Sequence, residues 1–336
     1  MEAEIKYRVN KEQHTSLGEV APLSQPYVLV VDPSNLCNFK CKFCPSGDME
    51  LIKSTGRYQG FLDFELFKNI IDSLQEFDEP LRVLRLYKEG EPLLNKRFVD
   101  MVRYAKQSGY VKRVDTTTNG VLLNPELNRK LIQAGLDQIN ISVNGVSSEQ
   151  INYYTRAKVD FDRYVDNIRD LYKNKGNCEI SIKSIKEILN TKEQDKFFDI
   201  FGGIANRIVL ENISPAWPQF IFHEDVAMEF TCGNYGQEIV NRKVCPYIFY
   251  IMVVNASGTV STCIGDWPNK QIVGDLKTQT VKEVWQGAAL DKYRVDHLMG
   301  NRSESEFCGE CQVVSHGTID NMDMQAHDIL KRMGNI

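Results

Sequence analysis

An α/β fold with parallel strands is predicted for most of this chain, because β-rich and helical segments alternate along it and polar motifs follow the strands. The β-rich segments are 27–31, 81–86, 111–116, 138–143, 179–185 and 206–210. The helical patterns lie between them, at 64–77, 95–108, 124–134 and 164–173. This alternation is typical of a barrel or an open α/β sheet, in which functional groups gather at the carboxyl ends of the strands.

The composition indicates an ordinary globular protein. Hydrophobic residues make up 42% and charged residues 25% of 336 residues, which is enough for one large domain or for a large and a small one. Lys and Arg number 40 against 45 Asp and Glu, so the formal charge is −5 and argues against a dominant basic face for nucleic acid. No apolar run approaches the roughly 20 residues that span a bilayer, and we expect a cytoplasmic protein without a membrane segment.

Nine cysteines are present, and their spacing points to metal rather than to disulfides, which are rare in a reducing compartment. They are Cys37, Cys41, Cys44, Cys178, Cys232, Cys245, Cys263, Cys308 and Cys311. Three fall within eight residues near the start, directly after the apolar segment 27–31. Three thiolates on one loop can hold three irons of a four-iron cubane and leave the fourth iron open, whereas a structural zinc site normally has four ligands.

This trio resembles the signature of the radical S-adenosylmethionine (SAM) superfamily, in which an aromatic residue precedes the third cysteine, as Phe43 does here. The resemblance implies that Cys37, Cys41 and Cys44 bind a [4Fe–4S] cluster whose open iron chelates SAM, with Phe43 near the adenine. SAM is then split into methionine and a 5′-deoxyadenosyl radical. The six strands match the family's partial (β/α)6 TIM-type barrel, here 27–211. The reductive step implies flavodoxin or ferredoxin as electron donor.

A SAM pocket is expected at the strand ends by the same resemblance. The segment Glu89-Gly-Glu-Pro92 stands where the family has Gly-Gly-Glu-Pro, so Gly90 and Glu91 match while Glu89 adds a carboxylate. The family's glycines let the backbone approach the amino group of SAM. Glu89 is interpreted either as a pocket carboxylate or as a solvated surface charge.

Polar residues after later strands complete the expected pocket. The third strand is followed by Asn119, and the fourth carries Ser142 and Asn144, which resemble the family's contacts to the SAM ribose and carboxylate. Each could instead cap a turn, since Asn-Gly is a turn signal by itself. Lys183 and Arg156 are candidates for the SAM carboxylate or the substrate, with an ordinary surface cation as the alternative.

The second cysteine group predicts a small auxiliary domain at 245–315. Cys245 and Cys263 flank two apolar β-like runs that predict a hairpin, a helix is expected at 281–290, and Cys308 and Cys311 form a Cys-x-x-Cys loop. The pattern resembles the SPASM and twitch domains. Because no cysteine follows Cys311, the twitch form with one fully ligated [4Fe–4S] cluster fits better. A structural zinc is the alternative.

Three segments lie outside the predicted barrel and auxiliary domain. Residues 1–26 are an N-terminal extension, 212–244 a connection or substrate lid, and 316–336 a C-terminal helical tail. A long connection at a barrel mouth often carries function. Cys178 is expected to be a buried apolar residue, and Cys232, on the connection, either a hydrogen donor or a non-catalytic thiol.

The leading hypothesis is oxidation of an alcohol carbon of a sugar, aminocyclitol or nucleotide-linked sugar. The auxiliary cluster would accept an electron, and the auxiliary spacing also resembles that of the 2-deoxy-scyllo-inosamine dehydrogenases. The candidate proton acceptors are Glu89, His223, Glu224 and Asp225. Epimerisation with Cys232 as hydrogen donor is a second hypothesis. Peptide maturation is a third, for which 1–26 is too short to be a leader-binding domain. A colourless zinc-stabilised binding module is the hypothesis without catalysis.

Overall fold

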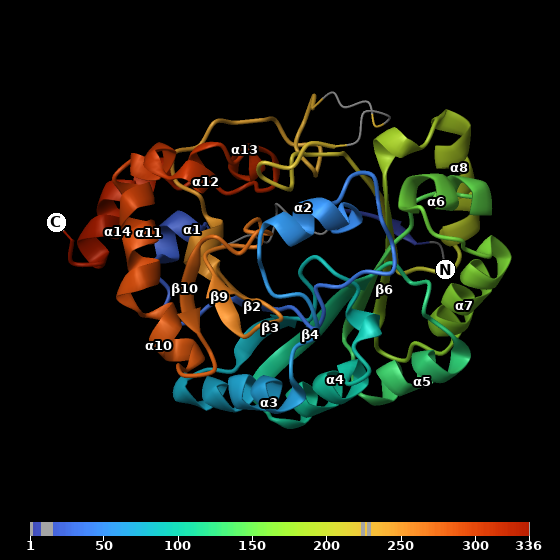
Figure 1. Cartoon of the computed structure of the whole chain (residues 1–336), viewed down its shortest axis with the longest axis horizontal. Helices are drawn as coiled ribbons and strands as arrows, with labels where there is room; N and C mark the ends of the chain where they lie inside the picture. The colour runs from blue at the N-terminus through green and yellow to red at the C-terminus, as the bar shows by residue number, and fades with distance from the viewer. Residues whose placement is uncertain (1–2, 8–15, 223–225, 227–229, 336) are drawn as a thin grey trace.

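The computed structural model describes residues 3–7, 16–222, 226 and 230–335, and its centre is a curved ten-stranded sheet (Figure 1). The strand order is β1-β7-β6-β5-β4-β3-β2-β8-β9-β10. The strands are β1 Glu4–Ile5, β2 Val28–Val31, β3 Leu81–Arg85, β4 Val111–Thr118, β5 Gln138–Ser142, β6 Glu179–Ile185, β7 Arg207–Glu211, β8 Ile251–Val254, β9 Thr259–Ser261 and β10 Ile272–Asp275. Strands β2 to β7 pair in parallel in chain order, which confirms the predicted barrel strands.

Helices cover the outer face of the curved sheet (Figure 1). They are α3 Phe64–Asp72, α4 Phe98–Gln107, α5 Pro125–Gln133, α6 Ser148–Thr155, α7 Phe161–Lys173 and α8 Thr191–Phe201. Alternate strand side chains such as Leu84, Ile139 and Ile180 are fully buried against them. Side-chain caps begin several of these helices; Asn124, for example, accepts hydrogen bonds from the first turn of α5.

The inner face of the sheet is polar. Arg113 on β4 contacts Glu179 on β6 at 2.8 Å, and Arg207 on β7 contacts the same carboxylate at 3.3 Å. One layer higher, Arg85 pairs with Asp115 at 3.1 Å. Because these charges satisfy one another, the barrel can keep a polar interior below its mouth.

The auxiliary segment continues the barrel sheet instead of standing apart from it. Strand β8 pairs in parallel with β2, and β8, β9 and β10 then form antiparallel pairs. The predicted hairpin is present, although its first half begins with the short helix α9, Tyr247–Tyr250. The helix expected at 281–290 is divided into α10 Val281–Trp285 and α11 Ala288–Leu298, which meet at Gly287.

Short elements complete the chain at its ends and over the mouth. They are α1 Leu17–Val20, α2 Met49–Ser54, α12 Glu306–Gly309, α13 Val313–His316 and α14 Ala326–Arg332. At the N-terminus, β1 adds an edge strand to β7. Within the described residues, none of the helices combines the length and apolar character that a membrane crossing requires.

Candidate functional site

The first cysteine group lies on the loop after β2, at the mouth of the barrel. Cys37, Cys41 and Cys44 all border one cavity of about 320 Å³, together with residues at the carboxyl ends of β3 to β7. The backbone N–H groups of Lys40 and Lys42 donate to the carbonyls of Thr155 and Tyr154, at 2.8 and 3.0 Å. The end of α6 therefore holds the cysteine loop in place.

The three thiols occupy surroundings that suit a metal centre more than free thiolates. Burial raises the pKa of Cys37 to about 11 and that of Cys44 to about 12. Burial, and then the neighbouring Cys44 and Cys37, raise the pKa of Cys41 well above its usual range. Without metal these thiols are protonated at neutral pH, so iron binding releases protons.

Amide groups from the expected SAM pocket point at these sulfurs. Asn119 Nδ2 lies 4.0 Å from Cys37 Sγ, and Asn144 Nδ2 lies 3.9 Å from Cys41 Sγ. The backbone N–H of Phe39 donates to Cys37 Sγ at 3.4 Å. Hydrogen bonds to ligating sulfurs tune the potential of an iron–sulfur cluster. Asn119 and Asn144 are thus brought to the cluster ligands, and their expected contact with SAM stays a prediction.

Glu91 joins two strand ends beneath the cavity. Its carboxylate accepts from Thr118 Oγ1 at 2.7 Å, from the Asn119 N–H at 2.8 Å and from the Leu93 N–H at 3.0 Å. Burial raises the pKa of Glu91 to about 7, although these hydrogen bonds oppose the shift. In this structure Glu91 ties the loop after β3 to the end of β4.

Gly90 allows a close approach of two loops. A Cβ there would overlap the carbonyl oxygen of Ser34 and would lie 2.7 Å from that of Leu36. Both are backbone atoms of the segment that leads into the cysteine loop. The observed close approach is therefore between the two backbones, while the approach to SAM expected from the resemblance stays a prediction.

We expect Gly90→Ala to lower both the thermal midpoint of unfolding and the iron retained after reconstitution, because neither backbone can move away without displacing the cysteine loop. Gly203→Ala is the matched control, since nothing lies within 4 Å of a Cβ at that position. Unfolding followed by circular dichroism, with iron analysis of both variants, checks this. Equal behaviour of the two variants would contradict the steric argument.

An ion pair crosses the cavity wall at the ends of β6 and β7. Lys183 Nζ lies 2.6 Å from Glu211 Oε2, and both residues line the cavity. Burial lowers the pKa of Lys183, but Glu211 and then Tyr87 raise it by more, so the net shift is upward. Lys183 is therefore a cation that holds the Glu211 carboxylate in place.

Several wall residues were missed by sequence reasoning. Glu211 is the last residue of β7 and Tyr87 follows β3. Their positions at the ends of strands could have identified them from the sequence as residues of the cavity wall. The predicted Phe43 and Ser142 do line the cavity. The connecting segment contributes Trp217 to the wall.

Glu89 is buried in an ion network and is neither a surface charge nor a free base. The side chains of Glu89 and Arg57 are each 1% exposed and form an ion pair, and Lys88 Nζ lies 3.3 Å from the same carboxylate. Arg57 also donates to the carbonyl of Trp267. Although Glu89 borders the cavity, two cations occupy its carboxylate.

The same network joins the barrel to the auxiliary segment. Lys88 Nζ donates to Asn255 Oδ1 at 2.7 Å, to the Asp266 carbonyl at 2.9 Å and to Asn269 Oδ1 at 3.0 Å. Beside it, burial and then Glu89 raise the pKa of Asp32 to about 7, against the opposing effect of Lys88 and Arg57. A charged contact thus connects the loop after β3 with the turn after Cys263.

The second cysteine group is brought together from the hairpin and the Cys-x-x-Cys loop. Burial, followed by Cys311 and Cys308, raises the pKa of Cys245. Burial, followed by Cys311, Cys245 and Cys308, raises that of Cys263. Burial raises the pKa of Cys311 to about 11. Gln271 Nε2 donates to Cys308 Sγ at 3.4 Å.

Both cysteine groups supply the thiolate ligands that iron–sulfur clusters and structural zinc use. Within the described ranges, no three His, Cys, Asp or Glu side chains are arranged around a single ion. A zinc ion needs its thiolates within about 2.3 Å of one point, whereas the ligands of a four-iron cluster bind different irons and stand farther apart.

Two predicted residues are not brought to the cavity. Arg156 caps the end of α6 and borders a separate outer hollow. Cys232 is half-buried and, among the described residues, is absent from the cavity wall, although Asn234 belongs to it. The remaining candidates, His223, Glu224 and Asp225, lie outside the described residues.

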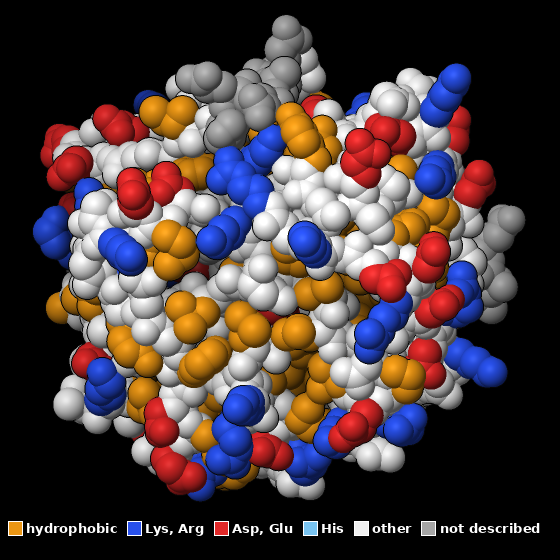
Figure 2. Space-filling model, turned by 45° about the vertical axis from the view of Figure 1, so that its right-hand side comes forward, with side chains coloured by type: hydrophobic (Ala, Val, Ile, Leu, Met, Phe, Trp, Pro, Cys, Tyr) orange, Lys and Arg blue, Asp and Glu red, His pale blue; other side chains and the backbone are white. Residues whose placement is uncertain are grey.

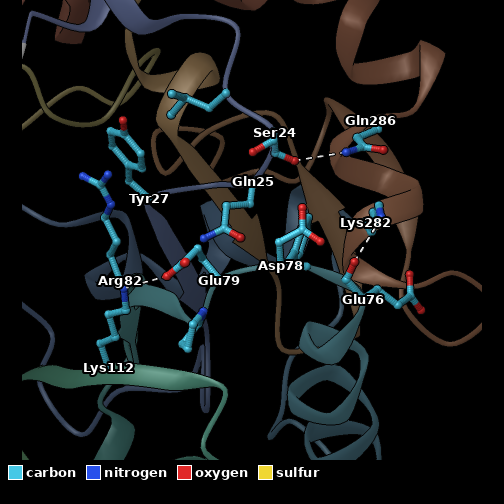
Figure 3. Close-up of a pocket in the computed structure, with 13 residues that line it drawn as sticks. Ser24, Gln25, Tyr27, Glu76, Asp78, Glu79, Arg82, Lys112, Lys282 and Gln286 are labelled. Carbon is cyan, nitrogen blue, oxygen red and sulfur yellow. Dashed lines mark hydrogen bonds and ion pairs between the residues drawn. The ribbon is translucent and has the colours of Figure 1, made fainter.

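A further hollow of about 450 Å³ lies at the opposite, amino ends of the strands (Figure 3). Lys112 pairs there with Glu79 at 3.4 Å, and Lys282 donates to the carbonyl of Glu76 at 3.0 Å. The Arg82 guanidinium stacks over the Tyr27 ring at 3.8 Å. These charges contact one another and no cysteine borders the hollow, so the cysteine-lined cavity is the candidate site.

Comparison with known proteins agrees with the two cysteine groups. The radical SAM superfamily model matches residues 31–185, and the SPASM iron–sulfur cluster-binding domain model matches 245–312. The AdoMet-dependent heme synthase of Methanosarcina barkeri is 22% identical over 334 residues, which cover 87% of this chain and 90% of that protein. The tungsten-containing aldehyde ferredoxin oxidoreductase cofactor-modifying protein of Pyrococcus furiosus is 29% identical over 169 residues, 50% of this chain and 45% of that protein. This chain thus spans less than half of the latter.

Solved structures share the fold. BtrN in complex with AdoMet and 2-DOIA has a TM-score of 0.56 at 19% identity and covers 88% of this chain and 97% of its own. SuiB of Streptococcus suis bound to the precursor peptide SuiA has a TM-score of 0.64 at 14% identity, with coverage of 89% and 72%. At these identities the likeness concerns the fold alone.

Proposed function

Because this chain belongs to the radical SAM superfamily and carries a SPASM iron–sulfur domain, we propose that it oxidises an alcohol carbon of a small carbohydrate-like substrate. The observation that carries the proposal is the Lys183–Glu211 pair in the wall of the cysteine-lined cavity. BtrN, which shares the fold, binds AdoMet and 2-DOIA, and this supports a small polar substrate beside SAM.

The residues that would hold the cofactors are the two cysteine groups. When bound, SAM and the cluster at Cys37, Cys41 and Cys44 supply a radical that takes a hydrogen atom from the substrate, and the auxiliary cluster supplies an acceptor for the electron left behind. The Asn119 and Asn144 amides beside Cys37 and Cys41 stabilise charge on those sulfurs.

Glu211 is the proposed proton acceptor. For a ketone to form, the substrate hydroxyl must lose its proton, and the Glu211 carboxylate is exposed to the cavity. Lys183, 2.6 Å away, orients that carboxylate, and it releases no proton itself because its pKa is raised. Glu89 is a poorer candidate because Arg57 and Lys88 already bind its carboxylate.

The polar lining below the cavity is consistent with a substrate rich in hydroxyl groups. A polar hollow of about 110 Å³ continues downward and shares Tyr87, Lys183 and Glu211 with the cavity. Asn140 and Ser181 line its lower part. A carbohydrate matches such a lining because each buried polar group needs a hydrogen-bond partner.

The test is anaerobic turnover with SAM and a reductant against sugars, aminocyclitols and nucleotide-linked sugars. Mass spectrometry is expected to show 5′-deoxyadenosine together with a product that has lost two hydrogens. A product of unchanged mass would instead indicate epimerisation, and a modified peptide would indicate maturation. Either result would overturn the proposed oxidation.

We expect Glu211→Gln to lower ketone formation by about 10²–10⁴-fold, because general-base catalysis contributes on this scale. Release of 5′-deoxyadenosine without product should persist, since hydrogen abstraction does not need this carboxylate. Glu211→Asp should partly restore ketone formation, and Glu149→Gln on the surface of α6 is the matched control. Full activity of Glu211→Gln would remove Glu211 from the mechanism.

A further inference from the structure

The Cys-x-x-Cys turn of the auxiliary segment is bound by an arginine that the proposed mechanism does not use. Gly300, with a φ of 86°, follows α11 and leads into the short 3₁₀-helix η5, Asn301–Glu304. This helix packs against α11 and α12 and carries Arg302. Arg302 Nη1 donates to the carbonyl of Cys308, which also accepts the Cys311 N–H at 3.3 Å. Arg302 therefore lies at the turn between two expected cluster ligands.

The guanidinium of Arg302 keeps its charge at this turn. Its Nε is buried and, within the part of the chain that the structure describes, has no hydrogen-bond partner. It forms no ion pair with any described carboxylate. The nearby Glu304, Glu306 and Glu310 are exposed, so water screens their charges. His297 on α11, 2% exposed, adds no charge at neutral pH because burial and then Arg302 lower its pKa to about 4.

The charge of Arg302 acts on the thiols of the auxiliary group. Burial raises the pKa of Cys245, and Arg302 opposes this rise. Burial likewise raises the pKa of Cys311 to about 11, and Arg302 again acts in the opposite direction. At Cys263, burial and then the other three thiols raise the pKa, and Asp266 adds to the rise. The group therefore has a cation beside Cys245 and Cys311 and a carboxylate beside Cys263.

Surface charges of the protein are of both signs and do not produce the same effect. Figure 2 shows Lys and Arg side chains mixed with Asp and Glu over the face it presents. Water and salt screen such exposed charges over short distances, whereas charges at buried groups are screened much less. A residue that changes the redox properties of a buried cluster must therefore lie beside its ligands, as Arg302 does.

The reduction potential of an iron–sulfur cluster depends on the charges and hydrogen bonds around it. Reduction adds negative charge, and burial makes this addition unfavourable. A cation beside the ligands stabilises the reduced form and raises the potential, as N–H groups that donate to sulfur do. The described residues fit such a cluster, since four thiols surround the site and Gln271 Nε2 donates to Cys308 Sγ.

We propose that Arg302 raises the reduction potential of the auxiliary cluster and thereby enables it to accept the electron left on the substrate radical. In that step the radical loses one electron and the auxiliary cluster gains it. The substrate O–H bond breaks as the C=O bond forms, and the proton passes to Glu211. The inference deepens the proposed function and rests on it, but the potential is measured without any substrate.

The experiment is a redox titration of the reconstituted holoenzyme followed by electron paramagnetic resonance, with and without SAM. The signal that SAM leaves unchanged belongs to the auxiliary cluster, because four thiols leave that cluster no open iron. Arg302→Gln keeps an N–H donor near Cys308 but removes the charge. It is expected to lower the equilibrium constant for reduction of the auxiliary cluster about tenfold, equivalent to about 59 mV for a one-electron couple. Arg302→Lys should restore most of the difference.

Arg332→Gln is the matched control. Arg332 on α14 also donates to backbone carbonyls, those of Gly18 and Glu19, and neither belongs to a cysteine group. This variant should leave the potentials of both clusters unchanged. The potential of the cluster at the first cysteine group should also be the same in all Arg302 variants, because Arg302 binds the second group alone.

An unchanged auxiliary potential in Arg302→Gln would overturn the proposal. An equal shift in Arg302→Lys would also overturn it, because the effect would then not come from the charge. The potential is measured on the loaded fraction, so partial loss of iron leaves the test decisive, and Arg302→Met is a second neutral variant. Loss of the auxiliary iron from all three variants, or zinc in its place in the parent, would equally overturn the proposal. A shifted potential without oxidation of any carbohydrate would support the role of Arg302 and contradict the proposed oxidation instead.

Discussion

Replacement of Cys37, Cys41 and Cys44 by alanine is expected to abolish 5′-deoxyadenosine formation and to lower the iron content from about eight to about four atoms per chain. The loss should be complete because these three thiols are the cysteines that border the cavity and would hold the cluster that binds SAM. Iron, sulfide and zinc analysis after anaerobic reconstitution, with SAM cleavage measured by chromatography, checks this result.

Cys178→Ala is the control for that variant, because Cys178 is buried among apolar residues away from both groups. It should retain all of its iron and activity. A fall from about four irons to none, with one zinc retained, would leave a radical enzyme with a structural zinc and remove the electron acceptor from the proposed oxidation. Zinc without iron in the parent would contradict the radical chemistry itself.

Glu89→Gln is expected to lower the free energy of unfolding by about 3–5 kcal/mol, the usual effect of removing one partner of a buried ion pair. Both side chains of the Glu89–Arg57 pair are 1% exposed, so Arg57 would be left as a buried charge without its carboxylate. Because Arg57 also binds the Trp267 carbonyl, the auxiliary iron should be retained less well. Chemical denaturation and iron analysis measure the two effects.

Two further variants distinguish the effect of losing the ion pair from a nonspecific loss of stability. Adding Arg57→Met to Glu89→Gln should recover part of the lost stability, since Arg57 is then no longer an uncompensated buried charge, while Lys88 still lacks the Glu89 carboxylate. Glu126→Gln breaks the surface pair with Lys130, whose members are 55% and 70% exposed, and should leave the unfolding midpoint unchanged. If Glu89→Gln is as stable as Glu126→Gln, the pair does not hold the two segments together.

The features that the sequence predicted correctly are those that depend on residues close together in the chain. Strand and helix periodicity is local, and for this reason the six barrel strands and the hairpin were found with small shifts at their ends. The spacing of Cys37, Cys41 and Cys44 is also local, because one loop presents all three thiols. Cluster ligands and fold class could therefore be predicted before any contact between distant residues was known.

The tertiary structure decided what depends on residues far apart in the chain. Glu89 could be a base or a surface charge until Arg57 and Lys88 were seen to bind its buried carboxylate. Glu211 became a candidate only through its contact with Lys183. In the same way, Arg156 was expected to bind the SAM carboxylate or the substrate, but it borders the outer hollow instead. The physical reason is that burial, charge pairing and access are properties of the packed chain, so the chemistry of a carboxylate follows from neighbours that its local sequence does not contain.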